Sequence, residues 1–280
     1  MDVIRIERTP RLRKPTMIAA FQGWNDAGGA ASLAANYLRA VTDAERFAVI
    51  DSEDFVDYQQ TRPTVSLIDG SIRRIDWPET ELFVAENNNL VVVVGTEPNL
   101  RWRGFATAIA DLARKLDVQL VITLGALLAD TPHTRPVPVS ATGSEQSLID
   151  DLGLTRSNYE GPTGIVGVLH DACAQAGLRS ASLWAATPHY ISATPNPRAA
   201  VAILERLAEL VGTPGPSAEL QRAASEYAVR VAAAIADDPD VLAYVEQLEE
   251  QSDAEDPPTG DQLAKDFERF LREQGGDASS

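Results

Sequence analysis

Two carboxylates of this chain directly follow apolar runs that are typical of buried strands. Asp26 lies in the glycine-rich turn of AFQGWNDAGGAASLAANYL, after the run Met17–Phe21, and Glu97 lies in VVVVGTEPN, after the run Leu90–Val94. In open α/β sheets, ligands bind beyond the carboxyl ends of the strands. Glu97 is therefore a candidate for a general base or for a group that binds a hydroxyl-bearing ligand. The alternative is that it caps the helix expected near Trp102.

The turn around Asp26 matches no phosphate-binding pattern. The segment contains neither G-x-G-x-x-G nor G-x-x-x-x-G-K-[ST], and no Lys follows its glycines to neutralise a phosphate. Asp26 would itself repel an anion. Asp26 is therefore a candidate residue of a ligand-binding site, but not of a phosphate-binding site. The alternative is that the glycines only allow a tight turn and close packing of the helix on the strand.

Three further candidates lie in loops of the same kind. His133 and Arg135 share the proline-rich loop DTPHTRPVPVS, where the guanidinium could bind an anion or a carboxylate. His189 lies in TPHYI, after another strand candidate. The alternative for His133 is a rigid loop in which its side chain bonds the backbone.

Thr163, in YEGPTGIVGVLHDA, precedes a helical pattern that begins near Ile165. The backbone amides at that helix end could form an anion pocket. The simpler alternative is that the Thr163 hydroxyl caps the helix.

These six residues form no complete catalytic set. The single cysteine, Cys173, lies in a helical pattern beside two alanines, which excludes an internal disulfide and a cysteine-based metal site. The chain contains no G-x-S-x-G and no paired-histidine zinc motif, and His170 lies in mid-helix, where a structural role is expected. We expect neither a metal nor a cofactor.

The elements that would position these residues alternate along the chain. The strand candidates are Thr16–Phe21, Arg46–Ile50, Glu81–Ala85, Leu90–Gly95, Gln119–Leu124 and Arg179–Ala186. The helix candidates are Gly29–Val41, Arg101–Leu116, Ile165–Ala176 and Ala199–Val211. This alternation predicts an α/β fold with a mostly parallel central sheet. In addition, Asp69-Gly70 between two strand-like arms predicts an antiparallel hairpin over Val65–Ile75.

A proline- and glycine-rich segment, Thr213–Ser217, predicts a boundary after the α/β domain of residues 1–212. Residues 217–275 are expected to form a small helical extension. Its last amphipathic helix carries Leu263, Phe267, Phe270 and Leu271. Residues 276–280 are expected to be disordered.

The formal net charge of −17 is concentrated in the C-terminal part. Residues 237–280 contain 14 acidic and 3 basic side chains, which is typical of an exposed interaction segment. No basic stripe is present, so nucleic-acid binding is not expected. The longest aliphatic run is too short for a membrane span, and the N-terminal residues lack the apolar core of a secretion signal. We expect a cytoplasmic protein with no membrane partner.

Several segments between residues 16 and 211 are each weak indicators of a family, but the order in which they occur is specific. They are AFQGWNDAGGAAS, DYQQTRPTV, VGTEPNLRW, PHTRPV, YEGPTGIVGVL, LWAATPHYI and ATPNPRAA. In this order they resemble the proteasome assembly chaperone 2 family, in its actinobacterial form.

The resemblance implies a phosphorylase/hydrolase-like α/β domain, a helical C-terminal extension and self-association, with a homotrimer favoured by analogy with phosphorylase-like folds. Eukaryotic members help to assemble the proteasome core particle, so proteasome subunits are candidate partners. Some archaeal relatives end in a hydrophobic-Tyr-any residue motif that docks into proteasome pockets. This chain ends in Ala278-Ser279-Ser280, so docking through that motif is not expected.

Two functions are compatible with these features. The first is a non-enzymatic protein-binding factor, such as an assembly or quality-control chaperone, and it is favoured because no nucleophile, base and orienting group occur together. The second is an enzyme that acts on a nucleoside-like or carboxylate/amide small molecule in a pocket at the strand ends. In that case we expect Asp26, Glu97, His133 and Arg135 to converge on one pocket. That alternative rests on analogy of fold alone.

Overall fold

The computed structural model describes residues 3–69, 72–143, 145–154, 159–191, 194–254, 261–262, 265–266 and 268–269. The strands are β1 Ile4–Ile6, β2 Thr16–Gln22, β3 Glu45–Ile50, β4 Thr64–Ile68, β5 Ile72–Asp76, β6 Thr80–Ala85, β7 Leu90–Thr96, β8 Leu120–Ala129, β9 Val139–Gly143 and β10 Ser180–Pro188. The helices are α1 Ala30–Val41, α2 Trp102–Lys115, α3 Gln146–Leu152, α4 Ile165–Gln175, α5 Pro197–Val211, α6 Ala218–Ile235 and α7 Pro239–Ala254.

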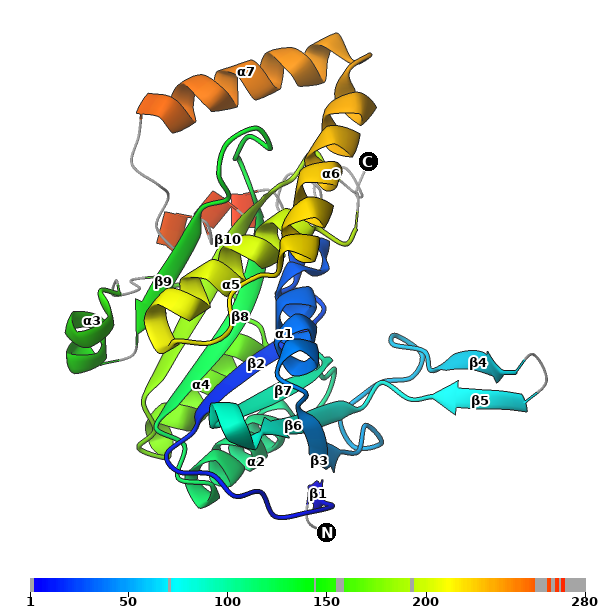
Figure 1. Ribbon diagram of the computed structural model, residues 1–280, viewed down its shortest axis with the longest axis vertical. Coiled ribbons are helices and arrows are strands. Elements are labelled where there is room, and N and C mark those ends of the chain that lie inside the picture. Colours follow the sequence, from blue (N-terminus) through cyan, green and yellow to red (C-terminus); the bar gives the residue numbers. More distant parts are fainter. Residues whose placement is uncertain are drawn as a thin grey trace.

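Eight strands form one central sheet in the order β1-β3-β6-β7-β2-β8-β10-β9 (Figure 1). The neighbours β7, β2, β8 and β10 pair in parallel, whereas β1, β6 and β9 run antiparallel to their neighbours. The α/β fold with a mostly parallel sheet is therefore confirmed, because five of the eight strands run in one direction. The antiparallel pairs lie toward the two margins of the sheet.

Strand β2 shows why the sheet is covered on both sides. Its alternate residues enter two separate hydrophobic clusters: Ile18 and Ala20 enter the first, and Met17, Ala19 and Phe21 enter the second. Successive side chains of a strand point to opposite faces, so an unbroken apolar run buries both faces.

Helices cover each face of the sheet. The first cluster receives α1 and α5, whose small residues such as Ala31 and Ala199 are fully buried and allow close approach to the strands. The second cluster receives α2 and α4, where Phe105 stacks edge-on against Phe21 with ring centroids 5.7 Å apart. The chain is thus a three-layer sandwich with helices on both sides of the sheet (Figure 1).

The expected hairpin is present. Strands β4 and β5 pair in an antiparallel, separate two-stranded sheet that projects away from the body (Figure 1). The turn residue Gly70 lies outside the described residues, so only the two arms are described.

The helices after Ser217 extend from the end of α5. Helix α6 packs along α5, and the Tyr37 hydroxyl of α1 joins the connecting segment by donating to Gly215 O at 3.1 Å and accepting from Ser217 N at 2.7 Å. Helix α7 then crosses above the carboxyl ends of the strands (Figure 1). The expected helical residues Leu263, Phe267, Phe270 and Leu271 and the expected disordered residues 276–280 lie outside the described residues.

Candidate functional site

The carboxyl ends of β2, β7, β8 and β10 meet along one edge of the sheet, because these neighbours run in parallel. Asp26 follows β2, Glu97 follows β7, and His133 and Arg135 follow β8. His189 follows β10 directly. The loops that carry these five residues therefore lie along a common edge of the sheet.

Asp26 belongs to the N-terminus of α1. Its Oδ1 accepts hydrogen bonds from the backbone amides of Ala31 at 2.8 Å and Ser32 at 3.2 Å. Burial raises the pKa of the Asp26 carboxyl, against the lowering effect of these hydrogen bonds. Gly28, with φ of 63°, turns the chain sharply between strand and helix. The carboxylate therefore serves the helix end.

Glu97 joins three segments that are far apart in the sequence. Its Oε1 accepts from Asn25 Nδ2 at 3.1 Å and from Ile165 N at 2.8 Å, and its Oε2 accepts from Trp24 N at 3.3 Å. Ile165 is the first residue of α4, so Glu97 caps α4. The alternative that Glu97 caps the helix near Trp102 is wrong, because its carboxylate points to the other helix on that face.

Thr163 does not cap α4, contrary to one sequence-based interpretation. The N-cap residue is Gly164, which makes no side-chain capping bond. A Cβ atom at Gly164 would collide with the side chains of Asn25 and Glu97, so glycine is needed for this close approach. The Thr163 residue itself is exposed.

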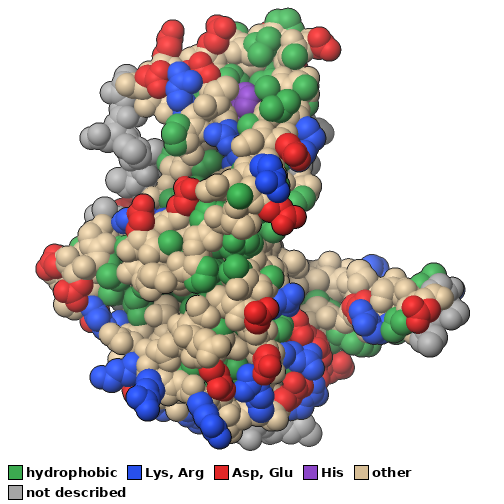
Figure 2. Space-filling view, in the orientation of Figure 1, with side chains coloured by type: hydrophobic (Ala, Val, Ile, Leu, Met, Phe, Trp, Pro, Cys, Tyr) green, Lys and Arg blue, Asp and Glu red, His purple; other side chains and the backbone are tan. Residues whose placement is uncertain are grey.

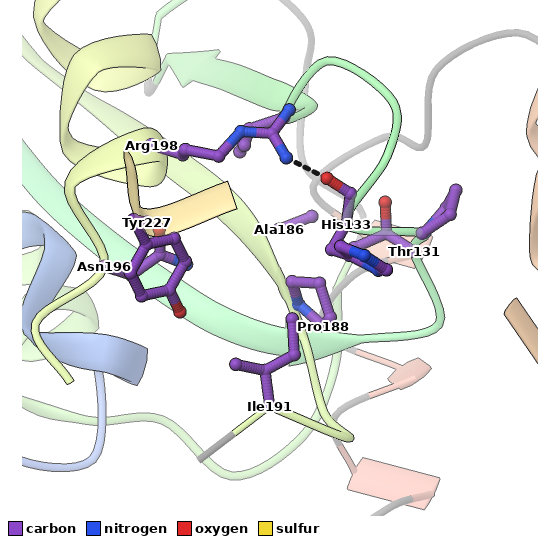
Figure 3. A pocket seen from close by; sticks show the side chains of 10 residues that line it. Thr131, His133, Ala186, Pro188, Ile191, Asn196, Arg198 and Tyr227 are labelled. Carbon is purple, nitrogen blue, oxygen red and sulfur yellow. Dashed lines mark hydrogen bonds between the residues drawn. The ribbon is translucent and has the colours of Figure 1, made fainter. Parts of the chain in front are cut away.

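His133 lies in a polar network around the pocket of Figure 3. Tyr190 Oη accepts from His133 N at 2.8 Å and lies 2.9 Å from His133 Nδ1, while the Arg198 guanidinium donates to His133 O. Burial and the charge of Arg198 lower the pKa of the His133 imidazole. The Tyr190 hydroxyl thus contacts both the ring and the backbone N–H of His133, and Arg198 holds the His133 carbonyl.

His189 lies 3.2 Å, by its Nδ1, from Asp130 Oδ1, and its ring makes edge contacts with Tyr190 and Tyr244. Tyr244 comes from α7 and donates to the same Asp130 oxygen at 3.0 Å. Aromatic and imidazole rings from β10 and α7 thus pack over the end of β8.

Arg135 is engaged by α7. Its Nε and Nη2 donate to the two carboxylate oxygens of Asp253 at 2.8 and 2.7 Å, and its Nη1 lies 3.4 Å from Glu249 Oε1. The guanidinium holds the pKa of the Asp253 carboxyl below its usual range. The carboxylates that bind Arg135 therefore come from α7 of the same chain.

The structure separates the four residues that were expected to share one pocket. Asp26 serves α1 on one face of the sheet, whereas Glu97 serves α4 on the opposite face. His133 faces Tyr190, and Arg135 faces α7. The edge is common to them, but their side chains point to four different partners.

Sequence reasoning missed Tyr190, Tyr244, Arg198 and Asp130. Asp130 was missed because β8 continues to Ala129, five residues beyond the expected end. The side chain of Asn196, which accepts from Ala199 N at 3.2 Å at the start of α5, could have been found from the sequence Asn196-Pro197, a common helix start.

Within the described part of the chain, no group of three or more His, Cys, Asp or Glu side chains is placed to hold a metal ion. In the same residues, no helix combines the length and the apolar character that crossing a bilayer requires.

The comparisons with known proteins agree with this architecture. The profile of the PAC2 family matches residues 20–235. The chain belongs to the PAC2 family. A PAC2 family protein from Streptomyces avermitilis is 47% identical, with a TM-score of 0.75 over 82% of this chain and 99% of that one.

Two mycobacterial structures are also similar. The Mycobacterium tuberculosis proteasome-assembly chaperone homologue is 41% identical, with a TM-score of 0.74 over 82% of this chain and 99% of that one. A protein of unknown function from the same organism is 30% identical, with a TM-score of 0.83 over 98% of this chain and 96% of that one. A search among curated proteins found no match.

Proposed function

We propose that this PAC2 protein is a non-enzymatic factor that binds other proteins and takes part in the assembly or quality control of a multisubunit complex, with proteasome subunits as candidate partners. Its similarity to the mycobacterial chaperone homologue supports the proposal. The engagement of Asp26, Glu97 and Arg135 in helix capping and ion pairing supports it as well, since these groups already stabilise the fold.

The observation that carries the proposal is the exposed acidic face of α7. One side of α7 is seated on the body, with Val245 and Leu248 buried. The other side presents carboxylates such as Glu246 and Glu250 to solvent, and residues 237–254 contain no Lys or Arg. Acidic side chains stand out along this helix in Figure 2. Such a surface favours a partner with basic side chains.

The test is capture of purified proteasome subunits by the full chain and by the double variant Glu246→Lys/Glu250→Lys. The proposal expects weaker capture by the variant and a steep loss of capture with added salt, because rim charges act through screened electrostatics. Glu219→Lys, an exposed carboxylate on α6, is the matched control and is expected to bind like the wild type. Equal capture by all three proteins would contradict the proposal.

The remaining expectations follow from the same proposal. We propose a cytoplasmic location, and the single cysteine, Cys173, is consistent with a reducing compartment. No cofactor is assigned to it.

A further inference from the structure

A crevice lies between the carboxyl ends of β2 and β7. The chain leaves β2 toward α1 on one face of the sheet and leaves β7 toward α2 on the other face. Such a reversal is the topological switch point of a doubly wound sheet, the place where these folds bind ligands. Here the crevice is open to solvent and has a volume of about 300 Å³. That volume suits a small ligand.

Three of the polar side chains that line the crevice are available to a ligand: Gln22 is exposed, and Thr61 and Thr96 are half-buried. Glu97 lines it as well. Its Oε2 accepts only the long 3.3 Å bond from Trp24 N, so this oxygen retains accepting capacity.

The walls of the crevice are fixed by other contacts. Asn99 Oδ1 accepts from Asp57 N at 2.9 Å, and Asn99 N donates to Phe55 O at 2.8 Å, which holds the loop after β7 against residues 55–61. The Trp102 indole N–H is already donated to Pro98 O, so only the apolar ring of Trp102 is offered to a ligand.

Gly23 keeps the carboxylate accessible. Its φ is 138°, and a Cβ atom there would lie 3.0 Å from Glu97 Cβ and 3.2 Å from Glu97 Oε2. A side chain at this position would strain the backbone and press on the Glu97 carboxylate.

We propose that this crevice binds a neutral polyhydroxylated ligand, either a free sugar or the sugar of a nucleoside. The hydroxyl groups of such a ligand can donate hydrogen bonds to the Glu97 carboxylate. They can also donate to and accept from the Gln22 amide and the hydroxyls of Thr61 and Thr96. The residues that line the cavity include no Lys or Arg, and the Glu97 charge repels anions. A phosphate or carboxylate ligand is therefore disfavoured, whereas the Trp102 ring suits the apolar face of a sugar or a base.

The proposal is independent of the acidic face of α7, and its test uses the full chain with D-ribose and with adenosine as separate probes. Binding is followed by calorimetry and by the NMR shift of the Trp102 indole N–H. Gln22→Ala and Thr96→Val are each expected to raise the Kd about tenfold, the change produced by losing about 1.4 kcal/mol of hydrogen bonding. Gln119→Ala, an exposed glutamine at the opposite edge of the sheet, is the matched control and should bind like the wild type.

The two probes distinguish the sources of the sugar. Equal affinity for D-ribose and adenosine assigns the crevice to a free sugar, and tighter binding of adenosine with a larger Trp102 shift assigns it to a nucleoside. The melting temperatures of Gln22→Ala and Thr96→Val verify that both variants fold. The proposal is overturned if neither probe binds saturably at millimolar concentration, or if folded Gln22→Ala binds as tightly as the wild type.

Discussion

Single side chains at the sheet edge hold distant segments together. Glu97 bonds the turn after β2 and the first amide of α4, and these contacts span 73 and 68 positions of sequence. A carboxylate that accepts several N–H donors stabilises each of them without leaving a buried donor unpaired. The contacts of Glu97 at this edge therefore stabilise the fold, whether or not the edge binds a ligand.

The charge and acceptor set of Glu97 lead to a first prediction. In Glu97→Gln, one accepting oxygen becomes an NH2 group that faces amide donors. We expect the free energy of unfolding to fall by about 1 kcal/mol, because the NH2 group replaces a hydrogen-bond acceptor at a half-buried position. Urea denaturation measures it. Glu205→Gln, an exposed carboxylate on α5, should change stability by less than about 0.5 kcal/mol. Equal losses of unfolding free energy in the two variants would show that the Glu97 contacts do not stabilise the fold.

His170 makes folding sensitive to acid. Its Nδ1 lies 2.8 Å from Ser180 Oγ and its Nε2 lies 3.0 Å from Thr123 Oγ1, within the interior. Burial lowers the pKa of His170 from 6.5 to about 4. The unfolded chain binds this proton near pH 6.5 and the folded chain only near pH 4. The stability that the neutral His170 ring contributes is therefore complete above pH 6.5, the unfolded pKa. It is lost as the pH falls from 6.5 to about 4.

We accordingly expect the free energy of unfolding to decrease on the order of 3 kcal/mol across that pH window, apart from the contributions of other groups. Urea denaturation near pH 7 and near pH 5 measures the slope. The variant His170→Gln is less stable overall, but its stability should depend less on pH over the same interval. A variant with the slope of the wild type would remove His170 as the cause.

Helix α1 shows how one element depends on a side chain that precedes it: Asp26 lies four residues before Ala30, the first residue of α1. Its alanine-rich face is fully buried against the sheet, and Asp26 pairs two amides at its N-terminus. Replacing Asp26 by Ala leaves both amides without that acceptor. We expect a loss of about 1–2 kcal/mol in unfolding free energy. Asp26→Asn keeps an acceptor oxygen and should retain most of the stability. If the two variants lose the same amount, the capping bonds do not explain the role of Asp26.

Elements with local patterns could be predicted from the sequence, and elements that depend on distant partners could not. Helix α2 was predicted within one residue at each end, because its apolar positions repeat at helical spacing. The edge strands β1 and β9 were missed, since both are short and β1 is largely exposed. The partner of Glu97 was missed for the same reason: sequence proximity suggested the helix that begins at Trp102, and the fold brings α4 closer.

At the scale of the molecule, three surfaces have different chemistry. The crevice between β2 and β7 is polar, α7 presents carboxylates, and the hairpin exposes several apolar side chains. Figure 2 shows hydrophobic side chains along the projecting hairpin. The strand ends were predictable as the place for a site, because topology fixes them. The role of each side chain there depends on which helix end it meets, and this is set by packing across the whole sheet.

One face of the hairpin carries three exposed apolar side chains beside Arg73, which pairs with Leu67. Val65 and Leu67 are each 61% exposed, and Ile75, which pairs with Val65, is 51% exposed on the same face. On the other face, Asp76 accepts from Ser66 Oγ at 2.8 Å and from Arg74 Nε at 2.6 Å. An isolated two-stranded hairpin is marginally stable at best in water, so a second copy of the chain is the expected cover.

We therefore predict a homo-oligomer, with a trimer favoured, in which the hairpins take part in the contact. Light scattering at micromolar concentration should give about three times the chain mass of 30.1 kDa. The double variant Val65→Ser/Leu67→Ser should shift the protein toward the monomer, because it removes apolar area from the contact while the core is unchanged. Val229→Ser, which alters an equally exposed apolar residue on α6, should leave the mass unchanged. A wild-type monomer would contradict self-association, and an oligomer that survives the double variant would place the contact elsewhere.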